Sequence, residues 1–297
     1  MPAAAISSTS STSAPSSRSN MRATSLLAAI ALGACSRPAP RVLCHNANCV
    51  EPTDPADDDS LATLHESLAL TIGGKPAIDG IEIDIFWRGS DATCLFAHDL
   101  EATRSTLATE VADELAAHIA ATATLTATPG PFRVYIELKP HVAPSKTSWH
   151  SPEQRTMHAD CAWDVYSRVA AAAVANARDV EVVFGSFEPS LLREMVARAP
   201  GSTPTPYRYS AFYGIPRPLD PQTRHPISDY TGIPISLIEA HPQWLNDAQY
   251  EGLLSQRVEI MFWMFSATVE TFQAIEQYEP DWVGTSEASL MRRWLEY

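Results

Sequence analysis

Two acidic residues within one short apolar segment, and a histidine at the end of the next such segment, are the residues best suited to catalysis or metal binding in this sequence. Residues 81–85 read Ile-Glu-Ile-Asp-Ile, so that acidic and apolar side chains alternate. Residues two apart on a β-strand point to the same face, so Glu82 and Asp84 should project together. A second apolar run follows and ends at His98. Two carboxylates with a histidine close by favour a hard divalent cation and a proton carrier.

The elements that must position these residues alternate along the chain. Amphipathic or Ala-rich segments typical of helices separate most of the strand-like runs. Alternation of this kind predicts a parallel sheet, and eight units predict closure into a single (β/α)8 TIM barrel of the α/β class. The eight predicted strands are 41–45, 81–87, 133–139, 180–184, 207–212, 235–238, 258–265 and 282–284.

Two features of the predicted barrel lie near its second strand. Residues 94–97 should return as a short strand, which makes a hairpin excursion after strand two. Ser60 can cap a helix whose apolar spacing runs to Ile72, before Gly73 and Gly74. Further helices are expected at 100–121, 151–177, 188–199, 246–255, 268–278 and 287–296.

In a barrel of this kind the carboxyl ends of the strands share one mouth, where active sites lie. His45, Glu82, Asp84 and Glu137 sit towards those ends on the first three strands, and His98 ends the excursion. Three converging carboxylates suit Ca²⁺ or Mg²⁺, and without a cation they would repel one another. Two histidines beside such a site can act as general base and general acid, which predicts a bell-shaped pH profile.

Simpler interpretations exist for several of these residues taken singly. Glu82 and Asp84 alone also fit a solvated strand face. Glu137 and Lys139, two apart on the third strand, also fit a plain ion pair on one face. Trp263 fits barrel packing as well as a binding site.

The motifs in their order resemble those of the glycerophosphodiester phosphodiesterase family, within the phospholipase-C-like barrel phosphodiesterases. The resemblance covers nearly all of the chain after Cys35. It is carried by a histidine after the first strand, an acid-x-acid pair, His-Asp, Glu-Leu-Lys, Ser-Phe and a late tryptophan. Here these are His45, Glu82 and Asp84, His98-Asp99, Glu137-Leu138-Lys139, Ser186-Phe187 and Trp263.

The resemblance implies a role for each matched residue in a metal-dependent phosphodiesterase. Acidic residues would bind the divalent ion, two histidines would form the acid–base pair, and others would contact the substrate. The implied metal ligands are Glu82, Asp84 and Glu137, the acid–base pair is His45 and His98, and the substrate-binding residues are Lys139, Asn46 and Trp263. The implied substrates are glycerophosphodiesters or lysophospholipid-type esters.

Departures from the family pattern leave two alternatives open. The usual His-Arg-Gly reads His45-Asn46-Ala47, which removes a bidentate phosphate ligand. The acidic Glu-Asn-Thr box is echoed only by Asp58-Asp59-Ser60, and the late Thr-Asp reads Thr285-Ser286. His45 to Asn48 is also similar to the His-x-x-Asn of the sphingomyelinase-D-like branch, which implies a phospholipase D that forms a cyclic phosphate. A non-catalytic phosphodiester-binding lipoprotein is the second alternative.

Residues 1–34 have the features of a disordered leader followed by a signal peptide. Arg22, an apolar run at 26–32 and small residues before Cys35 follow the layout of a secretory signal. The stretch resembles a bacterial lipoprotein leader, which implies cleavage before Cys35 and lipidation of that cysteine. An ordinary signal peptide cut nearby is the alternative. Residues 35–40 would then link the anchor to a phosphodiesterase domain at 41–297.

The leader, the net charge and the cysteines lead to expectations about location, binding partners and disulfides. The resemblance to lipoprotein leaders also implies a sorting rule, by which Ser36 after the lipidated cysteine favours the outer membrane or periplasm over the inner membrane. A net charge of −14 argues against nucleic acid, so the expected partners are a small-molecule or lipid phosphodiester and, through the anchor, a membrane. We expect a monomer. Cys44, Cys49, Cys94 and Cys161 could form two disulfides in three pairings, or stay as free buried thiols.

Overall fold

The structure, a computed structural model, describes residues 38–51, 54, 57–98, 106–140, 150–264 and 266–296. The expected leader and residues 35–37 of the linker, which include the expected lipidation site Cys35, lie outside the described residues. Asp99, which follows the expected catalytic His98, also lies outside them.

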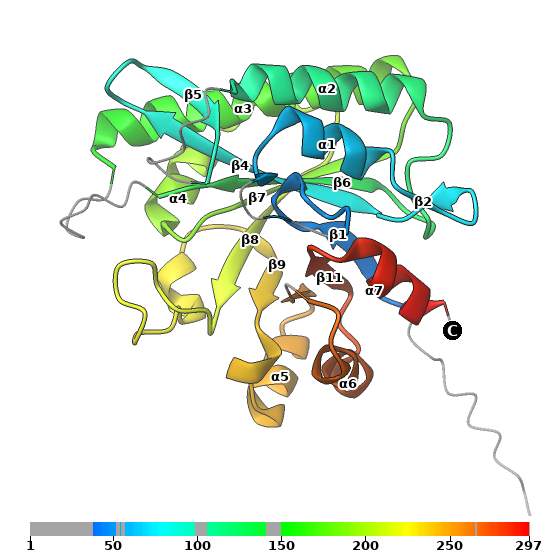
Figure 1. Cartoon of the computed structure of the whole chain (residues 1–297). Helices are drawn as coiled ribbons and strands as arrows, with labels where there is room; N and C mark the ends of the chain where they lie inside the picture. The colour runs from blue at the N-terminus through cyan, green and yellow to red at the C-terminus, as the bar shows by residue number, and fades with distance from the viewer. Residues whose placement is uncertain are drawn as a thin grey trace, which may run out of the picture. The chain divides into compact units, whose positions relative to one another are not determined.

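Eight parallel strands close into a barrel, as the alternation of strand and helix predicted (Figure 1). Each strand pairs with the next in chain order, and β1 pairs with both β11 and β4 to complete the ring. The strands are β1 Arg41–Cys44, β4 Gly80–Arg88, β6 Phe132–Leu138, β7 Val180–Gly185, β8 Tyr207–Tyr213, β9 Ile235–Ala240, β10 Glu259–Trp263 and β11 Trp282–Thr285.

The hairpin excursion after the second barrel strand is confirmed. Strand β5, Thr93–Phe96, runs antiparallel to the end of β4, with Phe96 opposite Ile85. The Ala97 N–H then donates to the Asp84 carbonyl at 3.1 Å. The excursion therefore returns the chain to the barrel mouth beside Asp84.

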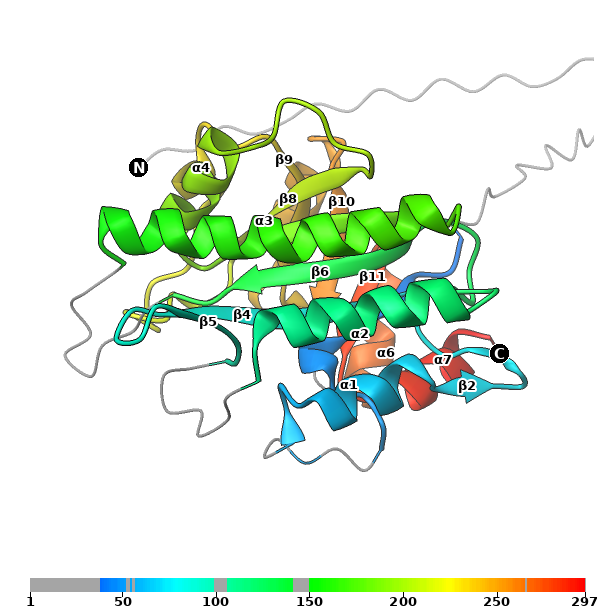
Figure 2. The ribbon, with the colours of Figure 1, turned by 90° about the horizontal axis from the view of Figure 1, so that it is seen from above.

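Helices cover the outside of the barrel (Figures 1 and 2). The two longest, α2 and α3, lie side by side along the outside of β4 and β6. None of the helices in the described part of the chain is long and apolar enough to cross a membrane. The helices are α1 Leu61–Leu68, α2 Ala108–Ala121, α3 Pro152–Ala175, α4 Pro189–Ala197, α5 Asp247–Leu254, α6 Val269–Tyr278 and α7 Ala288–Leu295, with 3₁₀ turns η1 His45–Ala47, η3 Ile227–Tyr230 and η4 Pro242–Trp244.

The helix predicted to run to Ile72 ends earlier. Helix α1 starts after the Ser60 cap, as expected, but stops at Leu68. Residues Thr71–Ile72 instead form β2, which pairs with β3, Lys75–Pro76. Gly73 and Gly74 both have positive φ and turn the chain into this hairpin. A β-branched pair next to such a turn favours a strand over the last turn of a helix.

The barrel interior is layered along its axis. A central apolar layer consists of inward-facing residues from six strands: Leu43, Tyr135, Val183, Leu237, Met261 and Trp282. At the amino ends of the strands, Arg133 is buried between Glu181 and Glu259 and stacks on the Trp282 ring. A third inward-facing layer, at the carboxyl ends of the strands and hence at the barrel mouth, contains Glu82, Asp84 and Glu137.

A candidate active site at the barrel mouth

Glu82, Asp84 and Glu137 meet at the barrel mouth. One carboxylate oxygen from each lies within 4.8 Å of the other two. Parallel pairing of β4 with β6 brings Asp84 opposite Glu137, and the period of two places Glu82 on the same inward face. Their exposed fractions are 3, 0 and 0 %, so the solvated strand face considered for Glu82 and Asp84 is wrong.

The chemistry of this cluster fits a divalent cation. Asp84 Oδ2 and Glu137 Oε2 are buried and have no hydrogen-bond partner among the described residues. Burial, together with the charges of Asp84 and Glu137, raises the pKa of Glu82 well above its usual range. Buried carboxylate oxygens that lack donors and repel one another are the ligands that Ca²⁺ and Mg²⁺ bind. The three carboxylates could therefore hold such an ion.

Lys139 supplies the cationic side chain nearest to the cluster. Its ammonium lies 3.2 Å from Asp84 Oδ1 and 2.9 Å from Glu137 Oε1. Burial opposes the charge of Lys139, but the two carboxylates outweigh it and raise the pKa of Lys139. The expected ion pair with Glu137 therefore exists, and it lies within the cluster. An ammonium held charged at this point can also meet an anionic ligand.

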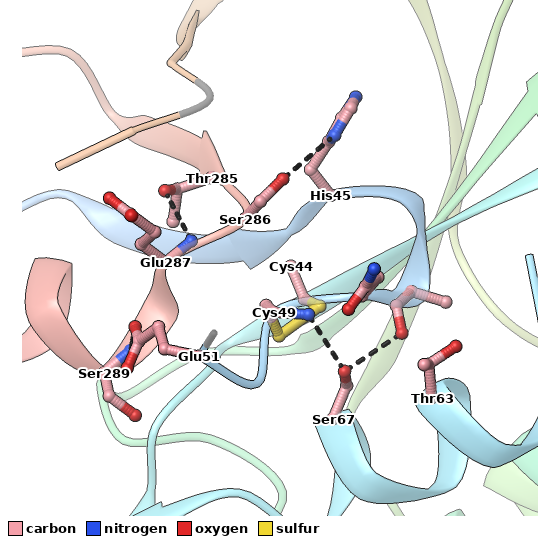
Figure 3. Close-up of a disulfide and its surroundings, with 12 residues drawn as sticks. Cys44, His45, Cys49, Glu51, Thr63, Ser67, Thr285, Ser286, Glu287 and Ser289 are labelled. Atoms are coloured by element: carbon pink, nitrogen blue, oxygen red, sulfur yellow. Dashed lines mark hydrogen bonds between the residues drawn. A yellow bond between two sulfur atoms is a disulfide. The ribbon is translucent and has the colours of Figure 1, made fainter. Parts of the chain in front are cut away.

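His45 lies beside Glu82 of the cluster. It follows β1 directly, and its Nε2 is 3.7 Å from Glu82 Oε2. Its Nδ1 is 3.5 Å from the hydroxyl of Ser286, which follows β11 (Figure 3). Burial first, and then the charges of Lys139 and His98, lower the pKa of His45 well below its usual value. The imidazole is therefore neutral near pH 7 and can accept a proton.

His98 belongs to the same mouth but is exposed. Its charge helps, after burial, to lower the pKa of His45, so the two histidines interact electrostatically. Its backbone N–H donates to the carboxylate of Asp59. The structure thus brings one buried and one exposed histidine to the rim of the acidic cluster.

Trp263 lies at the end of β10 and faces His45. The two rings meet edge to face with centroids 5.1 Å apart. Phe187 and Phe212 each lie 6.3 Å from Trp263 and stack on each other at 4.0 Å. These three rings form an aromatic wall at the mouth.

A cavity of about 490 Å³ borders the aromatic wall at one residue. Phe187 lines both, and the cavity also contains three arginines and the buried His225. The arginines are Arg155, Arg193 and Arg217. Phe187 is thus the residue that the aromatic wall and this cavity have in common.

The structure gives the contacts of Asn46 and the pairing of the cysteines, which the sequence analysis left open. Asn46 is buried, and its Nδ2 donates to Asp58 at 3.2 Å, so its amide is held by the segment between η1 and α1. Of the three possible pairings, the structure has Cys44–Cys49 and Cys94–Cys161. One disulfide therefore encloses His45, and the other ties the excursion to α3.

Two buried acids near the mouth were not among the residues expected to act there. Asp59 is 4 % exposed, and burial and the charge of Asp84 raise its pKa well above its usual range. The Asp58-Asp59-Ser60 echo of the family's acidic box was its signal. Glu239 on β9 is 1 % exposed. It had no signal, because a lone acid near the end of a weak strand is indistinguishable from a surface residue.

Three histidines outside the matched motifs are held by other contacts. His241 Nδ1 accepts from the Gln243 N–H at 3.3 Å, and its ring packs on Trp244. His150 and His158 are hydrogen-bonded core residues, joined to each other at 3.3 Å and to Glu188 and the Ile85 carbonyl.

Comparison with known proteins gives structural matches only. No protein-family model and no curated protein matches the sequence. A glycerophosphodiester phosphodiesterase from Parabacteroides distasonis is similar in structure, with a TM-score of 0.57 at 13 % identity over 88 % of this chain and 98 % of that one. An Oleispira antarctica phosphodiesterase, in complex with the product sn-glycerol-3-phosphate, gives 0.54 at 14 % identity over 87 % and 97 %.

A third structure extends the same finding. A glycerophosphodiester phosphodiesterase from Agrobacterium tumefaciens has a TM-score of 0.50 at 16 % identity, over 87 % of this chain and 100 % of that one. The matches span the whole length of these proteins, so the likeness extends to the complete barrel. The chain therefore has the (β/α)8 barrel fold found in glycerophosphodiester phosphodiesterases.

Proposed function

We propose that this chain is a divergent glycerophosphodiester phosphodiesterase, a metal-dependent hydrolase of small or lipid phosphodiesters. The observation that carries the proposal is the buried convergence of Glu82, Asp84 and Glu137 beside Lys139 and a neutral His45. These residues lie at the mouth of a barrel whose structural neighbours carry phosphodiesterase names. A bound cation, a contact for the anionic phosphate and a proton acceptor each promote phosphodiester hydrolysis.

The acidic cluster and Lys139 have complementary tasks in this proposal. Glu82, Asp84 and Glu137 would hold a Ca²⁺ or Mg²⁺ ion, whose charge offsets that of the phosphodiester and of the transition state. Lys139 orients a phosphate oxygen through its ammonium, which the neighbouring carboxylates keep charged. The aromatic wall at Trp263 borders the alcohol group of the substrate, and the adjoining arginine-lined cavity gives that group room.

The two histidines divide the proton transfers. Burial and nearby cations keep His45 neutral, so it accepts the proton of the attacking hydroxyl or water. His98, at the exposed rim, then donates a proton to the leaving alkoxide. Aspartate at the family's Thr-Asp position is replaced by Ser286, so the partner of His45 Nδ1 at this site is a neutral hydroxyl.

A substrate screen with matched variants tests the proposal. Hydrolysis of glycerophosphocholine, glycerophosphoethanolamine and lysophosphatidylcholine is measured with Ca²⁺, Mg²⁺ or EDTA. Glu82→Gln and His45→Ala should each lower kcat at least 100-fold, the range for a lost cation ligand or general base. His65→Ala, an exposed histidine that pairs with Glu114, is the control and should keep full activity. Activity that survives both changes, or that EDTA does not affect, would refute the assignment.

The same reactions separate the alternatives by their products. A phosphomonoester and a free alcohol support hydrolysis, whereas a cyclic phosphate supports the sphingomyelinase-D-type reaction. Binding of glycerophosphocholine in calorimetry without any product would support a non-catalytic lipoprotein.

We further propose that the enzyme is exported and anchored through a lipid on Cys35, at the outer membrane. Support comes from the signal-like segment before Cys35 and from Ser36 after it. Metabolic labelling with a fatty-acid analogue should label the wild-type chain and not Cys35→Ala. Labelling of both, or of neither, contradicts the lipid anchor.

A further inference from the structure

The segment that carries His45 is a closed loop. Cys44 is the last residue of β1, and its disulfide to Cys49 encloses only residues 45–48 (Figure 3). Both cysteines are fully buried. His45 is therefore attached on one side to the barrel strand and on the other to a turn whose far end is covalently tied back to that strand.

The backbone inside this loop has a conformation that would not persist without support. Asn46 and Ala47 have φ values of 50° and 53°, in the left-handed region. Asparagine tolerates this region, but alanine rarely adopts it, and two such residues in succession are unusual. Residues in sparsely populated regions persist when the surrounding structure over-determines them. The loop at His45 therefore needs external ties.

Hydrogen bonds from the next helix complete the attachment. Ser67 of α1 donates its hydroxyl proton to the Ala47 carbonyl at 2.9 Å and accepts from the Cys49 N–H at 3.1 Å (Figure 3). Within the loop, the Asn48 N–H donates to the His45 carbonyl at 3.0 Å. Ser67 can make both bonds only while the turn through Ala47 and Cys49 keeps its shape, and the disulfide fixes the end of that turn at Cys49 to its start at Cys44.

We propose that the Cys44–Cys49 disulfide is a positioning device for His45. It holds the left-handed turn that directs the imidazole to within 3.7 Å of Glu82 and 5.1 Å of the Trp263 ring. The inference rests on the proposed function, in which His45 transfers a proton. The cation ligands lie on β4 and β6, outside the loop, so the disulfide acts on proton transfer and not on cation binding.

The test compares Cys44→Ala/Cys49→Ala with a variant that loses stability elsewhere. Leu115→Ala removes a buried side chain from α2, on the outside of the barrel, and serves as the stability control. Both are assayed at a temperature where circular dichroism shows them fully folded. The disulfide variant should lose about 100-fold in kcat, the cost of misplacing a catalytic group by about 1 Å. Its KM and its Mg²⁺ and Ca²⁺ affinities should stay within about threefold of wild type, and Leu115→Ala should keep wild-type kcat.

Hydrogen exchange provides a second measurement that does not depend on activity. In the disulfide variant the Asn48 amide should exchange at least ten times faster, while the amides of β4 and β6 stay protected. If the folded variant keeps wild-type kcat or wild-type exchange at Asn48, the inference is wrong. If the wild type hydrolyses no phosphodiester, the proposed function fails. In that case, unchanged exchange at Asn48 would also refute a role for the disulfide in ordering the loop.

Discussion

Glu239 should make the stability of this protein depend on pH in a predictable direction. Its Oε1 accepts hydrogen bonds from the hydroxyls of Tyr135 and, at 2.7 Å, Ser210. Burial outweighs these bonds and raises the pKa of Glu239 from 4.5 to about 8. The folded protein thus holds this acid neutral at pH 7, whereas the unfolded chain ionises it.

The sign and size of the effect follow from linkage. An acid whose folded pKa is raised binds more protons when folded, so stability falls as pH rises from about 4.5 to about 8 and then levels off. At 1.36 kcal/mol per pKa unit, the whole window corresponds to about 5 kcal/mol. Glu239→Gln keeps the Oε1 acceptor for both hydroxyls and cannot titrate. The free energy of unfolding of the variant, relative to that of the wild type, should therefore rise by about 5 kcal/mol between pH 4.5 and pH 9.

Urea denaturation of both proteins across this pH range, in EDTA, measures the difference directly. Subtraction removes the contributions of the other titrating groups, because both proteins share them. Glu276→Gln, which makes the same chemical change at an exposed acid on α6, is the matched control. A Glu239→Gln difference that stays constant within about 0.5 kcal/mol would refute the raised pKa.

Three further predictions concern single side chains. Lys139→Met leaves Asp84 without its ammonium partner and should lower the free energy of unfolding by about 3–5 kcal/mol in EDTA, part of which Ca²⁺ restores. A free energy of unfolding in EDTA that equals the wild-type value would contradict this. Trp263→Ala should raise KM about tenfold, equivalent to about 1.4 kcal/mol, while Trp263→Phe retains most of the affinity; unchanged KM would leave Trp263 with packing alone. Arg292→Met breaks a buried ion pair with Asp79 at the amino end of the barrel. Denaturation should show a loss of about 3–5 kcal/mol in the free energy of unfolding, and steady-state kinetics should show an unchanged kcat.

The strands of the barrel and the shared face of Glu82 and Asp84 could be predicted from the sequence, because both depend on local patterns. A buried parallel strand is a continuous apolar run, and a period of two fixes which side chains share a face. The predicted end of α1 was wrong because the same local pattern was followed too far. Ile72 continues the helical spacing, but the turn at Gly73 and Gly74 places Ile72 in a strand.

What the sequence by itself determined is therefore the succession of strands and helices and the strand face on which each acid stands. Only the tertiary structure decided which distant residues meet. The pairing of Cys44 with Cys49, the position of Lys139 between two carboxylates and the burial of Asp59 and Glu239 all depend on distances set by barrel closure. Closure brings strand ends far apart in the chain to one mouth, and no local pattern encodes those separations.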